Sequence, residues 1–233
     1  MKNGFQRIEM LIGEENLKKL QKSRVAVFGI GGVGGHALEA LVRAGVGEVD
    51  IVDSDKVDIT NLNRQIIATV KTVGLLKVDA AESRMKEINQ KVVINKYPVF
   101  YGRENSQEFD FSKYDYIIDA IDSVSSKIEL VLRAQECGVP IISCMGTGNK
   151  LNAADLEVAD IFKTSVCPLA RVMRYELKKR GVKRLKVVYS KEEPKKSNLD
   201  EKGRPVPASI SFVPAAAGLI MAGEAVKEII CDA

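Results

Sequence analysis

The sequence predicts an α/β fold: a Rossmann-like, mostly parallel sheet with an N-terminal helix and a smaller C-terminal α+β extension. Between about residues 24 and 150, short apolar strands alternate with helical segments, a pattern typical of βαβ units whose sheet is covered on both faces. The Gly-rich turn "GIGGVG" follows the first of these strands and opens a helix. We expect one domain over residues 1–233, with a nucleotide-binding core at about 24–150 and a substrate-side extension at 151–233.

The expected elements of the first half follow from apolar spacing and from the Gly residues that end helices. Residues 5–22 carry a charged amphipathic pattern and are expected to form one helix. The Gly-rich turn opens a helix that ends at Gly45. The remaining expected strands and helices of this half are residues 24–30, 48–53, 92–99, 114–122 and 139–144 as strands, and residues 74–89 and 125–138 as helices.

The second half changes character. Residues 154–162 and 184–190 are expected strands, and residues 168–181 are an expected helix because Pro occupies its first position and Gly ends it. Residues 191–209 are polar, contain Pro and Gly, and predict a mobile loop. A helix over about residues 214–230 is expected to close the chain.

Composition is typical of an ordinary soluble protein of 233 residues, 45% hydrophobic and 28% charged. The net charge of +4 permits an anionic partner such as nucleic acid. No CxxC pair occurs, which argues against a tetrathiolate zinc site, and few Cys fit a reducing cytosol. The start of the chain lacks a signal-peptide pattern, and the longest apolar stretch, residues 213–223, is too short to span a bilayer. We therefore expect a cytoplasmic protein that does not enter a membrane.

The Gly-rich turn is the first functional signal. Gly29, Gly31 and Gly34 stand in GxGxxG register, which lets backbone N–H groups approach a phosphate at a helix N-terminus. Asp53 follows Gly34 by 19 residues, close to the separation expected of an acid that binds ribose. A Rossmann turn that binds nothing stays an alternative.

The polar loop "DITNLNRQ" indicates which nucleotide binds. A dinucleotide needs the glycine turn and one acid, but this loop adds Arg64, and the next helix adds Lys77. Preorganised cations stabilise the charge that shifts among phosphoryl oxygens when a triphosphate is cleaved. These cations therefore favour ATP over NAD, although Arg64 also fits a surface ion pair and Lys77 a solvated helix position.

Asp122 is the candidate ligand for Mg²⁺. It follows an expected strand at its carboxyl end, where open α/β sheets place their ligands, and Mg²⁺ prefers carboxylate oxygens. Asp119 precedes it within the strand and is expected to be buried. Asp122 also fits the N-cap of the helix that starts near Ser123.

Four segments together resemble one family: "GIGGVG", "DSDKVDITNLNRQ", "VGLLKVDAA" and "DAIDSVSSK" are similar to the ThiF/MoeB/HesA superfamily of adenylating enzymes. The resemblance implies that residues 1–233 are a single ThiF-type domain in which a carboxylate attacks the α-phosphate of MgATP. It also implies a homodimer in which Arg7 reaches into the partner's site, although an exposed helix residue explains Arg7 equally well. The nucleotide-binding residues that it implies are Gly29, Gly31, Gly32, Gly34, Asp53, Asp55, Asn61, Arg64, Gln65, Lys77, Asp122 and Ser123.

One branch of the superfamily, the tRNA threonylcarbamoyladenosine dehydratases, resembles the chain over nearly its whole length. "DAIDSV" followed by Lys127, "ADIFKTSVCPLARV", "VVYSKEEP" and "FVPAAAGLIMAGEAVKEI" carry this likeness. It implies a substrate tRNA whose modified nucleoside carries a carboxylate. ATP would adenylate this carboxylate, and another atom of the modification would then attack the activated carbon and close a ring with loss of water. The basic residues 176–186 are expected either to hold the tRNA backbone or to form a solvated face.

Three residues and three other functions stay open. Cys167 is the one candidate nucleophile, although a structural Cys fits better; Lys127 is a candidate for approaching the carboxylate or the phosphates; and His36 fits a bystander near the phosphates. The main alternative function is adenylation of the C-terminus of a ubiquitin-like sulfur carrier, and a sulfur-transfer protein remains a candidate partner. An NAD-dependent dehydrogenase and a non-catalytic nucleotide-binding protein are the others.

Overall fold

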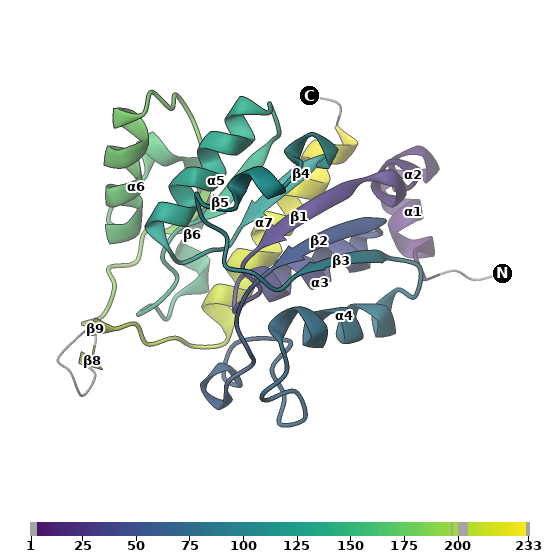
Figure 1. The fold of residues 1–233 in the computed structure, drawn as a ribbon, viewed down its shortest axis with the longest axis horizontal. Helices are drawn as coiled ribbons and strands as arrows, with labels where there is room; N and C mark the ends of the chain where they lie inside the picture. The colour runs from purple at the N-terminus through teal and green to yellow at the C-terminus, as the bar shows by residue number, and fades with distance from the viewer. Residues whose placement is uncertain (1–3, 197, 200–204, 232–233) are drawn as a thin grey trace.

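A seven-stranded sheet forms the centre of the protein in the computed structural model, which describes residues 4–196, 198–199 and 205–231 (Figure 1). Neighbouring strands are parallel except for β6, which pairs antiparallel with β7. This confirms the predicted mostly parallel α/β sheet. In spatial order the strands are β3 (Val93–Tyr97), β2 (Glu48–Val52), β1 (Arg24–Phe28), β4 (Tyr116–Asp119), β5 (Ile141–Cys144), β7 (Lys186–Ser190) and β6 (Leu156–Asp160).

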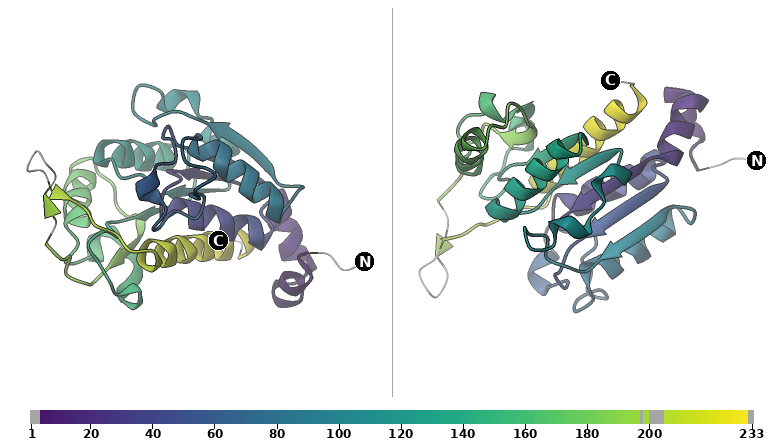
Figure 2. Two further views of the ribbon diagram at one scale, coloured as in Figure 1. Left: turned by 90° about the horizontal axis from the view of Figure 1, so that it is seen from below. Right: turned by 45° about the horizontal axis from the view of Figure 1, so that its top comes forward.

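Helices cover both faces of the sheet (Figure 2). The helices α2 (Glu14–Lys22), α3 (Gly34–Ala44), α4 (Lys77–Ile88) and α7 (Phe212–Ile230) bury their apolar residues on one face. On the other face lie α5 (Val124–Glu136) and α6 (Pro168–Lys179), together with an aromatic cluster around Phe28. Short 3-10 helices lie in the connections: η1 (Ile59–Asn61), η2 (Ser106–Glu108), η3 (Phe111–Lys113), η4 (Ala153–Asp155) and η5 (Ile161–Lys163).

The N-terminal segment differs from the prediction. Residues 5–22 form two helices, α1 (Gln6–Ile12) and α2, rather than one. The break is at Gly13, whose φ of 86° and ψ of 158° lie outside the helical region and are accessible because Gly has no Cβ. Met10 and Leu11 of α1 are 80% and 85% exposed, so α1 leaves an apolar face uncovered within one chain.

Packing of α3 against α7 brings the C-terminal helix to the glycine loop. Leu38, Leu41 and Val42 of α3 are fully buried, and each such side chain contributes about 1.5–3 kcal/mol on leaving water. The close contact depends on Gly218 of α7, where an added Cβ would lie 2.3 Å from the carbonyl oxygen of Val33. The start of α3 is therefore held by the end of the chain as well as by the sheet.

The segment 191–209 contains more structure than the expected loop. Within it, β8 (Asn198–Leu199) pairs with β9 (Pro205–Val206), while residue 197 and residues 200–204 lie outside the described part. Strands of two residues are too short for a periodic pattern, so the sequence did not indicate them. Asn149 anchors the segment, because its backbone N–H donates to the carbonyl of Ala208 and its side-chain oxygen accepts from the N–H of Ala208, both at 2.7 Å.

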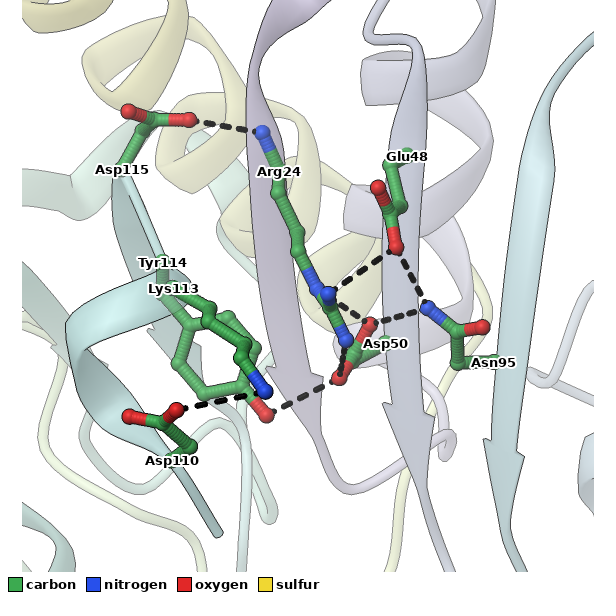
Figure 3. A network of polar contacts seen from close by, with 8 residues as sticks. All are labelled: Arg24, Glu48, Asp50, Asn95, Asp110, Lys113, Tyr114 and Asp115. Atoms are coloured by element: carbon green, nitrogen blue, oxygen red, sulfur yellow. Dashed lines mark hydrogen bonds and ion pairs between the residues drawn. The ribbon is translucent and has the colours of Figure 1, made fainter.

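A polar network at the amino ends of the strands stabilises the edge of the sheet opposite the glycine loop (Figure 3). Asp50 of β2 is fully buried and accepts hydrogen bonds from Arg24 at 3.0 and 2.9 Å, from Asn95 at 2.8 Å and from Tyr114 at 2.9 Å. A buried carboxylate with this many donors is satisfied, so we assign the network a structural role.

Among the described residues, no helix is long and apolar enough to cross a membrane.

Candidate nucleotide site

The glycine loop lies where the order of the sheet reverses. β1 has β2 on one side and β4 on the other, so the chain leaves β1 at a topological switch point, where open α/β sheets bind ligands. Gly29 has a φ of +87°, and an added Cβ would lie 2.7 Å from the carbonyl oxygen of Ala120. At Gly34 an added Cβ would lie 1.8 Å from the carbonyl oxygen of Gly29. These two glycines are required by the turn itself, before any ligand is considered.

Gly31 and Gly32 face the polar loop instead. An added Cβ at Gly31 would meet only Nε2 of Gln65, at 3.9 Å, and one at Gly32 would lie 3.3 Å from Cγ of Arg64 and from Pro214. The backbone of the loop is thus bordered by Arg64 and Gln65. A phosphate here would meet the N-terminus of α3 and its favourable dipole.

Asp53, Asp55 and Lys77 form an ion-paired group at the carboxyl end of β2. One carboxylate oxygen of Asp53 accepts from the N–H of Ile30 at 2.7 Å, and the other accepts from the N–H of Asp55 at 2.8 Å. Nζ of Lys77 lies 2.7 Å from Asp55 and 3.6 Å from Asp53. Burial raises the pKa of Asp53, and the charge of Lys77 opposes that rise. Lys77 is buried, so the alternative of a solvated helical lysine is wrong.

The polar loop is built by a capping box. The N–H of Thr60 donates to Asp58 at 2.8 Å, and the N–H of Asp58 donates to Oδ1 of Asn61 at 3.0 Å. The carbonyl of Asn61 then accepts from the N–H groups of Arg64 and Gln65. Asn61 therefore shapes the loop, a role that the sequence analysis missed, although the spacing of Asp58 and Asn61 is a recognisable cap signal.

Arg64 is held in place by neutral groups. Its guanidinium donates to the carbonyl of Thr60 and to the side chain of Asn63, both at 2.9 Å. It makes no ion pair with any residue in the described part of the chain, so the alternative of a surface ion pair is wrong. A cation that lacks a carboxylate partner beside Gly32 has its charge available for a phosphate.

Gln65 supplies an unsatisfied polar atom at the same place. Its side chain is buried, and Oε1 has no hydrogen-bond partner among the residues that the structure describes. Buried polar atoms are almost always paired, and exceptions occur where a bound molecule completes the hydrogen bonds. The orphan atom, close to Gly31, supports a ligand at this loop.

The turn after β4 separates the two acids of "DAID". Asp119 is fully buried, as predicted, and accepts from Nζ of Lys127 at 3.0 Å and from the hydroxyl of Ser143. Asp122 is exposed. The cap of α5 is Ser123, which accepts from the N–H of Ser126 at 3.5 Å, so the alternative that Asp122 caps this helix is wrong.

Lys127 does not lie where the sequence analysis expected it. It is fully buried, and its ammonium group donates to Asp119 and to the carbonyl of Ile121, each at 3.0 Å. A side chain bound in this way does not approach a carboxylate or phosphate of the substrate. The sequence spacing showed only that Lys127 follows Asp122 by about one helical turn. It did not show that Asp119 is the buried partner of Lys127.

At this edge of the sheet, Mg²⁺ would need phosphate oxygens of a bound nucleotide in addition to protein carboxylates. No group of three or more His, Cys, Asp or Glu side chains that could hold a metal occurs within residues 4–196, 198–199 and 205–231. Mg²⁺ is often bound by one or two carboxylates together with substrate phosphates and water. The exposed carboxylate of Asp122 fits that arrangement.

Arg7 and Cys167 lie apart from these contacts, whereas His36 lies beside the backbone of Arg64. Arg7 is exposed on α1 and has no hydrogen bond or ion pair to the described residues. Cys167 is buried at the start of α6, with Sγ 3.6 Å from the Cβ position of Gly146, as expected of a structural Cys. His36 is half-buried in the first turn of α3, and burial lowers its pKa.

A glycine loop at the switch point of a parallel sheet, with an acid at the end of the second strand, defines a Rossmann-type nucleotide-binding protein. The chain belongs to the ThiF family, whose model matches residues 5–232. It is similar to a tRNA threonylcarbamoyladenosine dehydratase of Bacillus subtilis, with 41% identity over 245 residues that cover 100% of this chain and 96% of the relative. A dehydratase of the same name from Escherichia coli is 36% identical over 168 residues, 72% of this chain and 63% of that one.

Solved structures agree with this assignment. The crystal structure of the E. coli tRNA N6-threonylcarbamoyladenosine dehydratase TcdA in complex with AMP matches with a TM-score of 0.90 and 31% identity, covering 97% of this chain and 93% of that one. The TcdA complex with ATP matches with a TM-score of 0.89 and the same coverage. The fold is therefore that of a protein solved with both nucleotides.

Proposed function

We propose that this protein is an ATP-dependent tRNA threonylcarbamoyladenosine dehydratase. The observation that carries the proposal is the position of Arg64, a cation without a carboxylate partner, beside Gly32 of a phosphate-binding loop. A dinucleotide needs no such cation, whereas cleavage of a triphosphate does. The full-length similarity to the B. subtilis dehydratase supports the same assignment.

The proposed reaction has two steps. The carboxylate of the modified nucleoside attacks the α-phosphorus of ATP, the bond to pyrophosphate breaks, and an acyl-adenylate forms. Another atom of the same modification then attacks the acyl carbon and expels AMP, which closes a ring with net loss of one water. Because the second nucleophile is intramolecular, well-oriented attack reaches effective molarities of about 10⁵ M or more.

Each site residue has a role in the first step. Backbone N–H groups of Gly31, Gly32 and Gly34, with the N-terminus of α3, take up phosphate charge. Gly29 contributes the turn instead, because its own N–H donates to the carbonyl of Val52 at 2.8 Å. Asp53 binds the ribose, while Arg64 and Lys77 stabilise the charge on the α-phosphoryl oxygens. The remaining proposed contacts to the nucleotide come from Asp55, Asn61, Gln65 and Ser123.

Magnesium has one proposed protein ligand. Asp122 would hold it together with phosphate oxygens, and the bound ion would neutralise phosphate charge. The geometry of Asp119 supports this role, because its own carboxylate is buried and already bonded to Lys127, which leaves Asp122 as the accessible acid of this turn.

The proposal extends to a homodimer in which Arg7 acts in the partner's site. The exposed apolar side chains Met10 and Leu11, one turn after Arg7, support an interface on α1. We propose the cytoplasm as the location because the substrate is tRNA. A sulfur-transfer protein as partner has less support. Cys144 and Cys167 are buried, and burial raises the pKa of the Cys144 thiol to about 12, while the exposed Cys137 and Cys231 lie at the C-terminal ends of α5 and α7.

The function can be tested by incubating the purified protein with ATP, Mg²⁺ and tRNA. One sample of tRNA carries threonylcarbamoyladenosine and the other lacks it. We expect AMP and pyrophosphate only with the modified tRNA, and a nucleoside lighter by one water in its digest. Pyrophosphate release that is independent of the modification would overturn the proposal. An adenylated C-terminus of a ubiquitin-like carrier would favour the alternative function, and NADH binding without ATP binding would favour a dehydrogenase.

A further inference from the structure

Helix α6 lies at one end of the molecule (Figures 1 and 2), and its exposed side chains include several cations. Ala170, Met173 and Leu177 bury one face of this helix against α5 and β7. On the opposite face Arg171, Tyr175 and Lys178 recur at the spacing of a single helical stripe, and all three are exposed. Of these three, Lys178 lies within residues 176–186, which the sequence leaves as either a tRNA contact or a solvated face.

The cations of this surface lack acidic partners. Neighbouring basic residues are neutralised or used: Arg180 pairs with Glu176, and Arg174 donates to the carbonyl of Thr164. In the part of the chain that the structure describes, no ion pair engages Arg171, Lys178, Lys179, Lys183 or Arg184. The net charge of the whole chain is +4, so these five unpaired cations carry about as much positive charge as the net charge of the protein.

The surface is also hollowed around an exposed aromatic ring. A depression of about 790 Å³ is lined by Arg171, Arg174, Tyr175, Lys178 and Lys183, and also by Phe162. The side chain of Tyr175 is 68% exposed among these cations. A solvated charged face has no need of an exposed ring, whereas a single-stranded nucleic acid pairs its phosphates with cations and stacks its bases on aromatic side chains.

We propose that this α6 surface binds the tRNA substrate away from the modified nucleoside. The cations hold backbone phosphates, and Tyr175 stacks on an unpaired base. Helix α6 begins at Pro168, directly after Cys167, which lies beside Gly146 at the carboxyl edge of the sheet; its 12 residues extend about 18 Å from that edge. One tRNA therefore reaches both the nucleotide site and α6. This inference rests on the proposed function, to which it adds the place where tRNA docks.

The salt dependence of tRNA binding tests the phosphate contacts. We expect Lys178→Gln/Lys183→Gln to lower the slope of log K against log salt concentration by about two, because each phosphate contact contributes about one. The double variant Lys22→Gln/Lys91→Gln removes the same charge from exposed lysines elsewhere and should keep the wild-type slope. An equal slope for both double variants and the wild type would overturn the proposal.

Tyr175 gives a second, independent readout. Tyr175→Ala should weaken tRNA binding by about fivefold or more, since stacking contributes about 1–3 kcal/mol per base, while Tyr175→Phe should bind like the wild type. In turnover, the α6 variants should raise the KM for tRNA with little change in kcat, and the affinity for ATP alone should be unchanged. A fall in kcat at unchanged KM would contradict a docking role.

The outcomes separate this inference from the proposed function. If the wild type binds tRNA through α6 but forms no AMP, the dehydratase assignment fails and the surface stands. If the wild type dehydrates tRNA while the α6 variants bind it normally, the surface is overturned and the function stands. Binding of the wild type, but not of the variants, to vesicles of anionic phospholipid, with tRNA binding unaffected, would assign the surface to a membrane instead.

Discussion

Lys127 and Asp119 form a fully buried ion pair, with Nζ of Lys127 3.0 Å from Oδ1 of Asp119. The same ammonium group donates to the carbonyl of Ile121, and the N–H of Ile121 donates back to Asp119 at 3.2 Å. The pair thus ties the end of β4 to the turn that carries Asp122. Asp122, the proposed magnesium ligand, is therefore positioned by an ion pair that it does not contact itself.

Loss of one partner of this pair should destabilise the protein strongly. Lys127→Met leaves Asp119 as an unpaired buried charge, so we expect the free energy of unfolding to fall by about 3–5 kcal/mol in urea titrations. The double variant Lys127→Met/Asp119→Leu removes both charges and should recover part of the loss. A double variant no more stable than the single one would show that the charge on Asp119 is not the cause.

Gly34→Ala tests the tightness of the glycine loop. Its new Cβ would lie 1.8 Å from the carbonyl oxygen of Gly29, so the backbone must move, and we expect a loss of stability of about 1–3 kcal/mol or more with loss of ATP binding. Gly223→Ala in α7 is the matched control, because its Cβ would meet nothing within 4 Å and the residue lies outside the phosphate loop. Equal ATP affinity in the two variants, measured by calorimetry, would contradict the role given to Gly34.

Asp122→Asn should separate turnover from nucleotide binding. The amide keeps the size of the side chain but loses its charge, so we expect the Mg²⁺-dependent rate to fall on the order of 10²-fold. Binding of ATP without metal should persist, since Asp122 is exposed and supports no other side chain in the described contacts. Normal turnover at limiting Mg²⁺ would remove Asp122 from the metal site.

Arg7 can be tested by mixing inactive variants. If Arg7 of one protomer acts in the site of its partner, Arg7→Ala and Lys77→Ala homodimers should each be inactive, while their mixture should regain a part of the wild-type rate. The regained rate should approach one quarter when subunits mix randomly, because about half of the dimers are heterodimers with one intact site. Two inactive variants that stay inactive when mixed would place Arg7 in its own chain or outside the reaction.

His36 should make stability depend on pH. Burial lowers its pKa in the folded state below the usual value of about 6.5, so folding favours the neutral ring. Its contribution to stability is present above about pH 6.5 and is lost as the pH falls towards the folded-state pKa. The wild type should therefore lose more stability than His36→Gln between about pH 7.5 and about pH 5.5. His36 is the one His in the sequence, so its NMR titration reports the pKa directly, and bound ATP should raise that pKa.

Local patterns predicted the elements that carry the glycine loop. The helix α3 ends where Gly45 adopts a φ of 98°, and β1 and β2 fall within the apolar runs 24–30 and 48–53. Periodicity and Gly stops are properties of neighbouring residues, so one sequence contains them. The break at Gly13 was missed because the amphipathic pattern continues through it, and a single Gly does not by itself end a helix.

Contacts between distant segments could not be predicted in the same way. Lys127 has the sequence spacing of an ordinary helical lysine, and its buried partner lies in another element. The sequence likewise could not predict that Arg64 lacks an acidic partner, because this depends on which side chains the fold brings near its guanidinium. Sequence spacing predicted that Asp53, Lys77 and Asp122 follow strand ends at one edge of the sheet, but their hydrogen bonds depend on the folded positions of several elements.

The packing of α7 has a consequence for biosynthesis. Pro214 and Gly218 of this helix border Gly32 and Val33, so the last long helix covers a flank of α3. Proteins leave the ribosome from the N-terminus, and an incomplete domain exposes apolar surface that promotes aggregation. Until residues 212–230 have emerged, that flank of α3 lacks its partner helix and its apolar side chains stay exposed.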